Sequence, residues 1–323
     1  MKLLVTGGLG FIGSNFILQV LKNNSDFSVT NIDAELTGSD HHNLDELKNS
    51  SNYKFVKGNI TNKIMMEKLI ENHDCIINFA AESFVDRSIL DANQSLVSNI
   101  RGTYTILEIL RKHKKRLIQI STDEVFGSLK EGSAHETSRF NPSNPYAATK
   151  ASAELLVNSY VNTYDLDCVI TRCTNNYGPR QFYEKLIPKT IFLANQNKKI
   201  PIYGKGENIR DWIYVNDHCE AVLRVLLDGK KGESYNVSSD NEIDNLSIVK
   251  KILELLGKSS DLIEFVTDRP GHDLRYSLNS SKIKNSLKWN PEISFDDGIQ
   301  NTIDWLINNS RGKDISENIL GST

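Results

Sequence analysis

Between residues 6 and 13 the sequence reads Thr6-Gly7-Gly8-Leu9-Gly10-Phe11-Ile12-Gly13. This stretch follows an apolar run at residues 3–6 and precedes a segment of helical periodicity that begins at Phe11. In such a strand–turn–helix setting, glycines permit a tight turn, and the free N–H groups of the helix N-terminus can bind a pyrophosphate. A glycine-rich turn without a ligand is the alternative. The setting favours a dinucleotide-binding turn and therefore predicts an α/β fold.

Asp33 ends a second predicted strand, at residues 28–33. In this position an acidic side chain can accept a hydrogen bond from an adenosine ribose, and its charge would repel a 2′-phosphate. We therefore predict NAD, rather than NADP, as the cofactor of this turn.

Further strands are predicted at residues 53–56, 75–79, 116–121 and 168–171, and further helices at residues 64–71, 94–112 and 145–163. Strands and helices that alternate in this order form a parallel sheet with helices on both faces, joined by right-handed crossovers. The predicted fold class is thus α/β, a doubly wound parallel sheet or Rossmann fold.

After residue 178 glycine and proline become frequent and the apolar runs shorten. We expect an NAD-binding Rossmann domain over residues 1–178, with return segments near residues 217–238 that have the pattern of a helix and a strand. A smaller, interleaved C-terminal α/β lobe over residues 179–309 would bind the substrate. The polar residues 310–323 would form a flexible tail.

The composition excludes several classes of function. A net charge of −3 over 323 residues gives no reason to expect a nucleic acid or a membrane surface as partner. The chain has no apolar stretch of bilayer length and no signal-peptide pattern at its start. Its four cysteines form no Cys-x-x-Cys pair, which is typical of reduced thiols in a cytoplasmic enzyme. No group of residues has metal-ligand spacing, so no metal is predicted.

Tyr146 and Lys150 are four residues apart on a predicted helix, so their side chains share one of its faces. The lysine charge would favour the phenolate and lower the pKa of Tyr146, which would make the tyrosine a usable base. Taken alone, such a pair could equally be an ordinary surface pair. Upstream, however, a buried strand ends in the polar run Ser121-Thr122-Asp123-Glu124, at the sheet edge where open α/β folds bind ligands. The combination favours catalysis.

The dipeptide Asp123-Glu124 extends the possible chemistry. Oxidation of an alcohol needs only Tyr146, Lys150 and a hydroxyl such as that of Thr122. Removal of water from the neighbouring carbons needs one group that takes a proton beside the ketone and another that protonates the departing hydroxyl. Two carboxyls in different environments can divide these roles. A helix N-cap followed by a first-turn acid is the structural alternative.

Through a set of motifs that includes these residues, the chain closely resembles the dTDP-glucose 4,6-dehydratases, a family of extended short-chain dehydrogenases/reductases. The resemblance runs from Leu3 to about Trp305. Its motifs stand at residues 78–88 (NFAAESFVDRS), 121–127 (STDEVFG), 145–150 (PYAATK), 171–179 (TRCTNNYGP), 184–188 (EKLIP), 201–206 (PIYGKG), 210–214 (RDWIY) and 268–273 (DRPGHD).

The resemblance implies the reaction and the roles of the catalytic residues. Tyr146, assisted by Thr122 and paired with Lys150, would take the proton of the glucose 4-hydroxyl while NAD oxidises C4. Glu124 would remove the C5 proton, and Asp123 would protonate the C6 hydroxyl so that water leaves. Hydride return to C6 would then give dTDP-4-keto-6-deoxyglucose and regenerate NAD.

The resemblance also implies binding residues. Those for NAD are Gly7, Gly10, Phe11, Ile12, Gly13, Asp33, Asn59, Ile60, Ala80, Ala81, Ser98, Tyr146 and Lys150. Those for the nucleotide sugar are Ser83, Asn175, Glu184, Lys185, Leu186, Arg210, Arg269 and His272. Guanidinium groups suit phosphates, although a surface ion pair with an adjacent aspartate is the alternative for the two arginines.

Four residues depart from the family pattern. Phe84 stands where the family usually has His, Phe126 where it has Tyr, Asn59 where it has Asp, and Ser98 where it has Thr. The segment 34–43 also diverges, around the adenosine ribose. These departures bear on cofactor affinity and on detail of the site, and none of them alters a residue that carries the chemistry.

Several alternatives stay open. A UDP-glucose 4,6-dehydratase is the nearest, while a nucleotide-sugar 4-epimerase or a decarboxylase would leave Asp123-Glu124 without a role. A non-catalytic NAD-binding protein would be free to lose Tyr146 and Lys150, which are both intact. The resemblance further implies a homodimer, joined through the helices predicted at residues 94–112 and 145–163, and a place in deoxysugar biosynthesis such as that of rhamnose.

Overall fold

A seven-stranded sheet forms the centre of the molecule. In a computed structural model, which describes residues 1–308, the strands pair in the order β10-β6-β5-β4-β1-β2-β3, and every neighbouring pair is parallel. Their bounds are β1 (Lys2–Thr6), β2 (Ser28–Asp33), β3 (Tyr53–Lys57), β4 (Cys75–Asn78), β5 (Arg116–Thr122), β6 (Cys168–Cys173) and β10 (Ser234–Val237). The predicted doubly wound parallel sheet is confirmed.

Alternation along the strands explains why the sheet has helices on both faces. Successive side chains of a strand point to opposite sides. Leu3 and Val5 belong to one buried apolar cluster, whereas Leu4 between them belongs to another. A sheet that is apolar on both faces needs cover on both.

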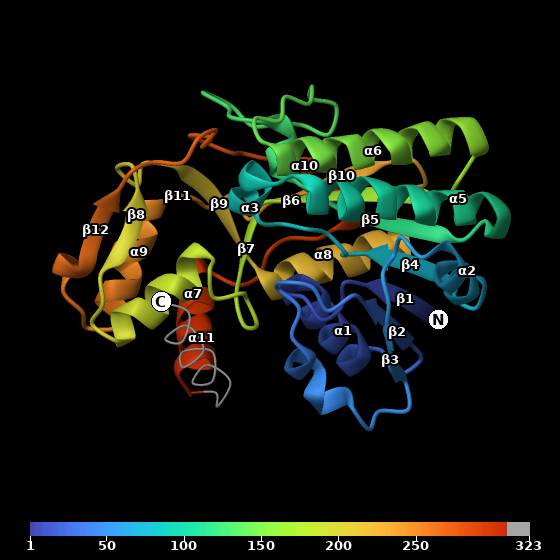
Figure 1. Cartoon of the computed structure of the whole chain (residues 1–323), viewed down its shortest axis with the longest axis horizontal. Helices are drawn as coiled ribbons and strands as arrows, with labels where there is room; N and C mark the ends of the chain where they lie inside the picture. The colour runs from blue at the N-terminus through green and yellow to red at the C-terminus, as the bar shows by residue number, and fades with distance from the viewer. Residues whose placement is uncertain (309–323) are drawn as a thin grey trace.

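Two groups of helices supply this cover (Figure 1). The apolar cluster that contains Leu3 and Val5 also contains residues of α1 (Phe11–Asn23) and α8 (Val215–Asp228). The cluster that contains Leu4 also contains residues of α2 (Lys63–Glu71), α5 (Thr103–His113) and α6 (Pro145–Tyr164). The helix predicted at residues 94–112 is present, but it consists of α4 (Asn93–Ser95), the π-helical η2 (Leu96–Gly102) and α5. A π-helical stretch inside an α-helix often marks a functional region.

A second group of elements lies at the opposite end of the molecule from β3 (Figure 1). It has a three-stranded sheet in the order β11-β9-β7 and a two-stranded sheet of β12 and β8. The strands are β7 (Asn175–Tyr177), β8 (Ile200–Tyr203), β9 (Ile209–Tyr214), β11 (Glu242–Asp244) and β12 (Ile263–Val266).

The remaining helices of the described residues, from both groups of elements, are α3 (Val85–Leu90), α7 (Leu186–Asn195), α9 (Asn245–Leu255), α10 (Ser281–Leu287), α11 (Phe295–Asn308), and the 3₁₀ helices η1 (His41–Leu47), η3 (Asp123–Phe126) and η4 (Ser260–Leu262).

The chain passes between the two groups more than once. After β7, β8 and β9 it returns through α8 and β10, which pairs with β6, and it then leaves again for β11. The predicted return segment near residues 217–238 therefore coincides with α8 and β10. The division of the chain at residue 178 stays a prediction, and the tail predicted at residues 310–323 lies outside the described residues.

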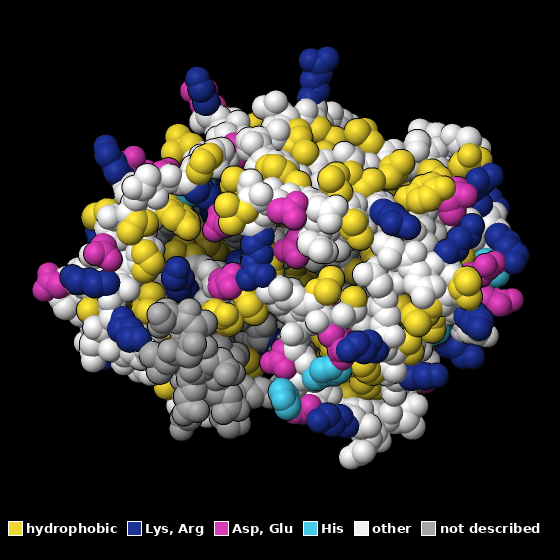
Figure 2. All heavy atoms as spheres, viewed as in Figure 1, with side chains coloured by type: hydrophobic (Ala, Val, Ile, Leu, Met, Phe, Trp, Pro, Cys, Tyr) yellow, Lys and Arg dark blue, Asp and Glu magenta, His cyan; other side chains and the backbone are white. Residues whose placement is uncertain are grey.

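Apolar side chains remain exposed over α5, α6 and their neighbours, as the yellow surface in the upper part of Figure 2 shows. Leu96 is 48% exposed, Tyr104 47% and Leu155 59%. Leu107 and Val157, which are on the same helices, are buried in the core. Only part of the apolar surface of these helices is therefore used within the chain. Within residues 1–308, no helix is both long enough and apolar enough to cross a membrane.

Candidate active site

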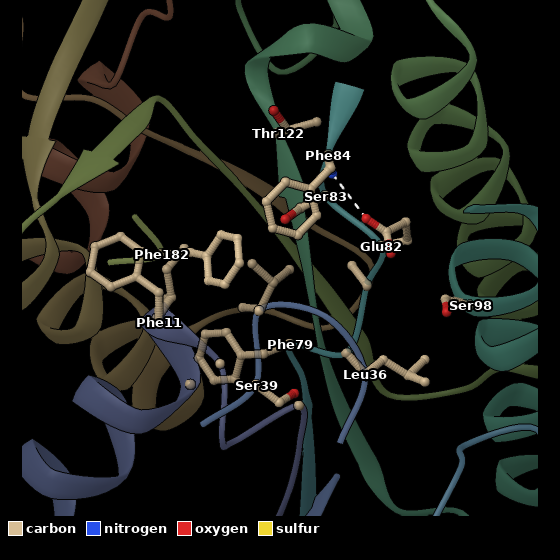
Figure 3. Close-up of a pocket in the computed structure, with 18 of the residues that line it drawn as sticks. Phe11, Leu36, Ser39, Phe79, Glu82, Ser83, Phe84, Ser98, Thr122 and Phe182 are labelled. Atoms are coloured by element: carbon tan, nitrogen blue, oxygen red, sulfur yellow. Dashed lines mark hydrogen bonds between the residues drawn. The ribbon is translucent and has the colours of Figure 1, made fainter. Parts of the chain in front are cut away.

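A cavity of about 310 Å³ opens at the edge of the large sheet where its parallel strands end. Such an edge is where open α/β sheets bind ligands. Figure 3 shows side chains from several elements that line the cavity, among them Phe11, Phe79, Ser83, Phe84, Thr122 and Phe182. All five predicted catalytic residues and all thirteen residues predicted for the cofactor line it: Gly7, Gly10, Phe11, Ile12, Gly13, Asp33, Asn59, Ile60, Ala80, Ala81, Ser98, Thr122, Asp123, Glu124, Tyr146 and Lys150.

The glycine turn leaves no room for side chains. Gly7 has φ +70°, and a Cβ there would lie 2.7 Å from the backbone of Ala80. A Cβ on Gly13 would lie 2.5 Å from the carbonyl oxygen of Gly7. Gly10 is the N-cap of α1, and no side chain caps this helix end. The backbone N–H groups at the start of α1 can therefore approach an anionic ligand directly.

Asp33 organises the loop that follows β2. It is 5% exposed and accepts hydrogen bonds from the backbone N–H of Leu9 (3.0 Å) and of Glu35 (2.8 Å) and from the hydroxyl of Ser39 (2.8 Å). Leu36 and Ser39 also line the cavity (Figure 3). Residues 34 and 36–39 of the divergent segment are thus part of the cavity wall, and Glu35 and Ser39 are held by the same carboxylate that was predicted to bind a ribose.

Three of the four departures from the family pattern lie at the cavity. Asn59, Ser98 and Phe84 line it. The side-chain oxygen of Asn59 accepts hydrogen bonds from the backbone N–H and the hydroxyl of Thr61, at 2.9 and 2.8 Å, so this side chain fixes its own turn. Phe126 instead is 3% exposed and packs in a separate apolar cluster beside Phe140.

Asp123 is a buried carboxyl that favours its protonated form. It is 4% exposed, the Thr122 hydroxyl lies 3.1 Å from its Oδ1, and its Oδ2 has no hydrogen-bond partner. Burial, together with the nearby charge of Glu124, raises the pKa of Asp123 to about 8. A carboxyl that keeps its proton at neutral pH can act as a general acid.

Glu124 differs from its neighbour in its hydrogen bonds. Its Oε2 accepts from the side-chain amide of Asn144 at 3.2 Å and from the hydroxyl of Tyr276 at 3.4 Å. The single hydroxyl proton of Tyr276 is shared between Glu124 and Asp273, and the Asp273 oxygen is the closer acceptor, at 2.6 Å. The two adjacent carboxyls therefore have distinct environments, as the separation of acid and base roles requires.

Tyr146 and Lys150 both point into the cavity from α6, at 8% and 5% exposure. The Lys150 ammonium donates to the carbonyl oxygen of Ile120 at 2.6 Å, and burial lowers the pKa of Lys150 to about 8. Burial, reinforced by the charge of Glu124, raises the pKa of Tyr146, while a hydrogen bond with Thr122 opposes the rise. The predicted lowering of the Tyr146 pKa by Lys150 is therefore not found: burial raises this pKa, and the Lys150 ammonium donates to the carbonyl oxygen of Ile120.

The residues predicted for the nucleotide sugar divide into two sets. Ser83, Asn175 and Lys185 line the cavity, and the Lys185 ammonium donates to the carbonyl oxygen of Ser83 at 3.1 Å. Glu184, Leu186, Arg210, Arg269 and His272 do not line it. Leu186 packs against apolar core clusters at the start of α7, which explains its place outside the cavity.

The charged members of the outer set are occupied by partners within the chain. Glu184 binds Arg87 (2.8 Å), Arg269 binds Asp86 (2.7 Å), and His272 binds Asp268 (2.6 Å). Arg210 is different: it is 5% exposed, lies over the ring of Tyr276 and donates to backbone carbonyls, including that of Asp273 at 2.8 Å. The alternative considered for both arginines, an ion pair with an adjacent aspartate, is therefore not what the described residues show: Arg269 pairs with the distant Asp86, and Arg210 donates to backbone carbonyls.

The sequence predicted no catalytic or binding role for part of the cavity wall. The cavity is also lined by Ile32, Ala34, Leu36, Thr37, Gly38, Ser39, Gly58, Phe79, Glu82, Phe84, Ile120, Ser121, Cys173, Thr174, Asn176, Gln181 and Phe182. Several of these follow the ends of β2, β3, β4 and β6, so the rule that ligands bind at the ends of parallel strands could have identified them. Tyr276 had no such signal, because it reaches Glu124 from a distant loop. Among residues 1–308 no group of three or more His, Cys, Asp and Glu side chains could hold a metal ion.

Comparison with known proteins adds independent information. A sequence model of the family described as GDP-mannose 4,6 dehydratase matches residues 4–302. The low-salt glycan biosynthesis protein Agl12 of Haloferax volcanii is 48% identical over 308 residues, which are 95% of this chain and 99% of that protein. A dTDP-glucose 4,6-dehydratase of Streptomyces niveus is 42% identical over 96% of this chain and 94% of its own. The crystal structure of DesIV, a dTDP-glucose 4,6-dehydratase from Streptomyces venezuelae with NAD bound, superposes with a TM-score of 0.94 at 40% identity, over 97% of this chain and 98% of that one.

Proposed function

The chain belongs to the GDP-mannose 4,6-dehydratase family, and on this premise we propose that it is a dTDP-glucose 4,6-dehydratase. It converts dTDP-glucose into dTDP-4-keto-6-deoxyglucose and water, with NAD as a cofactor that is recycled in each turnover. The observation that carries the proposal is the pair Asp123 and Glu124, which lies in the same cavity as Tyr146 and Lys150. A 4-epimerase needs only the second pair, whereas a dehydratase needs both.

The turn at residues 7–13 fits the cofactor. Its close-packed glycines and uncapped helix end would bind the pyrophosphate, and Asp33 would accept from the adenosine ribose. Bound NAD would supply reversible oxidation and reduction of the sugar. Its positive charge would also favour the phenolate of Tyr146, which opposes the effect of burial on the pKa of that group.

The protein's own residues move three protons. Tyr146, hydrogen-bonded to Thr122, takes the proton of the 4-hydroxyl as C4 becomes a ketone. The ketone makes the C5 proton acidic, and Glu124 removes it. Asp123 donates its proton to the C6 hydroxyl, which leaves as water. The hydride taken from C4 would be returned to C6, a proton would return to C5, and the proton held by Tyr146 would replace the one that Asp123 gives up, so C4 stays a ketone, the sugar loses one water overall and the cofactor ends unchanged.

The nucleotide sugar would enter from the side of α3, α7 and the segment 268–276. Ser83, Asn175 and Lys185 line the cavity there. We assign the remaining predicted residues, Glu184, Leu186, Arg210, Arg269 and His272, to the outer part of the same site. Substrate phosphates would replace Asp86 as the partner of Arg269, because guanidinium groups bind phosphate in the same bidentate manner as carboxylate.

We further propose that two copies associate through α5 and α6 as a homodimer. The exposed Leu96, Tyr104 and Leu155 support this, because a stable interface needs an apolar patch that the chain itself does not cover. The four cysteines are free and buried, which supports a reducing compartment such as the cytoplasm.

The test is to incubate the purified protein separately with dTDP-glucose and UDP-glucose, without added NAD, and to follow each sugar by mass spectrometry. The proposal predicts loss of one water from dTDP-glucose, supported by NAD that stays bound through purification. Faster turnover of UDP-glucose would favour the UDP-glucose 4,6-dehydratase instead. If both sugars kept their water while NAD remained bound, the dehydratase proposal would fail.

A further inference from the structure

Phe84 occupies a junction between the two sides of the cavity. It is the N-cap residue of α3, 8% exposed, and its backbone N–H donates to the Glu82 carboxylate at 3.2 Å (Figure 3). Its ring meets the ring of Phe182 edge-on, with centroids 5.2 Å apart. On the cofactor side the ring lies against Gly38, where an added Cβ would be 3.4 Å from two ring carbons. The ring is therefore fixed from three directions.

Two cations lie over this one ring. The Lys185 ammonium is 4.6 Å from the ring centroid, and the guanidinium carbon of Arg87 is 4.5 Å from it. The negative face of an aromatic ring attracts cations at such distances, and the attraction grows as water is excluded. Lys185 is partly buried, and this burial lowers the pKa of its ammonium. The ring therefore helps to keep this ammonium charged and in place.

The other contacts of the two cations leave them able to serve a ligand. The ammonium of Lys185 donates to the Ser83 carbonyl, and an ammonium has three donors in all. Arg87 is bound to Glu184 at 2.8 and 3.0 Å, a pair in which both side chains are about 40% exposed. Ser83 and Lys185 both line the cavity. The Phe84 ring thus contacts two cations, Lys185 and Arg87, beside the residues proposed to bind the nucleotide sugar.

We propose that Phe84 is a positioning residue for substrate binding, which holds the Lys185 ammonium, and with it Arg87, in the place where the nucleotide sugar meets them. The inference rests on the proposed function and adds to it a residue that departs from the family pattern. A histidine at this position would present a ring that becomes cationic near pH 6.5 and would then repel both neighbours. A phenylalanine ring does not titrate, so it attracts the Lys185 and Arg87 cations at every pH.

The test is a double-mutant cycle on the NAD-loaded enzyme, with dTDP-glucose as substrate. Phe84→Leu should raise KM about tenfold with a smaller change in kcat, because a cation–π contact at a desolvated site is lost. Phe84→Tyr, which keeps the aromatic face, should restore KM to near the wild-type value. In a Lys185→Met background, Phe84→Leu should have little further effect, since the ring would act through the ammonium.

A pH profile gives the second readout. Phe84→His should resemble the wild type at pH 8 and lose affinity for dTDP-glucose as the pH falls below about 6.5, where the imidazole gains its charge. Bound NAD and thermal unfolding identify variants that fold incorrectly. Independent effects of Phe84→Leu and Lys185→Met, a Phe84→Tyr variant as weak as Phe84→Leu, or a flat profile for Phe84→His would each overturn the role of Phe84. A wild-type enzyme that neither binds nor converts dTDP-glucose would overturn the proposed function, and this inference with it.

Discussion

The two sides of the cavity are built by different means. On the cofactor side, at residues 7–13 and 33–39, backbone packs on backbone, and the acidic group, Asp33, is held by hydrogen bonds from the surrounding loop. On the outer substrate side, charged side chains form ion pairs near the surface, Arg269 with Asp86 and Glu184 with Arg87. The first side is fixed by close packing, whereas under the proposed function contacts within the chain on the second side would be exchanged for contacts to the ligand.

This difference suits a cofactor that stays and a substrate that leaves. A turn with no room for a Cβ has one conformation, so binding to it costs little ordering. Exposed ion pairs contribute little free energy each, so they can be exchanged for contacts to substrate phosphates at small cost. The residues proposed for catalysis lie on β5, η3 and α6, between the two sides.

The largest effect, a loss of kcat, is expected for Asp123, which lies between the two sides of the cavity. Asp123→Asn removes the buried proton donor while it keeps the shape of the side chain, so kcat on dTDP-glucose should fall by about a hundredfold to ten-thousandfold. Steady-state kinetics would measure the loss, and the amount of bound NAD should stay as in the wild type. Retention of kcat within a few-fold would show that another group protonates the leaving hydroxyl.

The second largest effect, a loss of bound NAD, is expected on the cofactor side. Gly13→Ala places a Cβ 2.5 Å from the Gly7 oxygen and 2.9 Å from Gly8, so the turn must open at a cost of about 1–3 kcal/mol. The purified variant should contain much less NAD. Gly10→Ala is the matched control, because its Cβ would meet only the Gly7 oxygen at 3.2 Å, and it should lose less. Equal NAD content in both variants would contradict a turn specified by close packing.

A pH effect on stability should also follow from Asp123. Its pKa is raised from the ordinary value near 3.8 to about 8, so between these values the folded protein holds a proton that the unfolded chain releases. This contribution to stability is complete below about pH 4 and is lost as the pH rises toward 8, on the order of 1 kcal/mol per pH unit. Denaturant unfolding at several pH values should therefore show a flatter profile for Asp123→Asn than for the wild type. Parallel profiles would mean that Asp123 is charged in the folded state.

The smallest effect, a change in KM for dTDP-glucose, is expected on the substrate side. Asp86→Asn frees Arg269 from its carboxylate partner, so KM for dTDP-glucose should fall about twofold to fivefold with kcat unchanged, as the modest strength of an exposed pair allows. Asp165→Asn, which breaks the remote pair with Lys231, is the control and should change neither constant. A raised KM in Asp86→Asn would indicate that the pair positions Arg269 rather than competes for it.

The contrast between the two sides also explains what the sequence could reveal. The glycine turn, Asp33 and the polar end of β5 are local patterns tied to the edge of a parallel sheet, and every residue predicted for the cofactor and for catalysis lines the cavity. The strands and helices of the large sheet were likewise predictable, because their apolar periodicity is local.

The remaining features depend on contacts between residues that are distant in sequence. Tyr276 reaches Glu124 across 152 positions, and Arg269 reaches Asp86 across 183. No local pattern encodes which carboxylate an arginine will meet, so the predicted substrate residues were placed only by resemblance. The pKa of Tyr146 is also raised rather than lowered, because the phenol is buried, while the Lys150 ammonium donates to the carbonyl of Ile120 on β5.

We propose that Glu124 and Asp123 remove water across C5 and C6 in the same cavity where Tyr146 serves oxidation. The most direct test is turnover of dTDP-glucose in heavy water, with the product examined by mass spectrometry and NMR. The account predicts loss of one water and gain of one deuterium at C5 for the wild type, and neither for a Glu124→Gln variant that retains its NAD. A product that has lost water but carries no deuterium at C5, or a Glu124→Gln variant as active as the wild type, would contradict it.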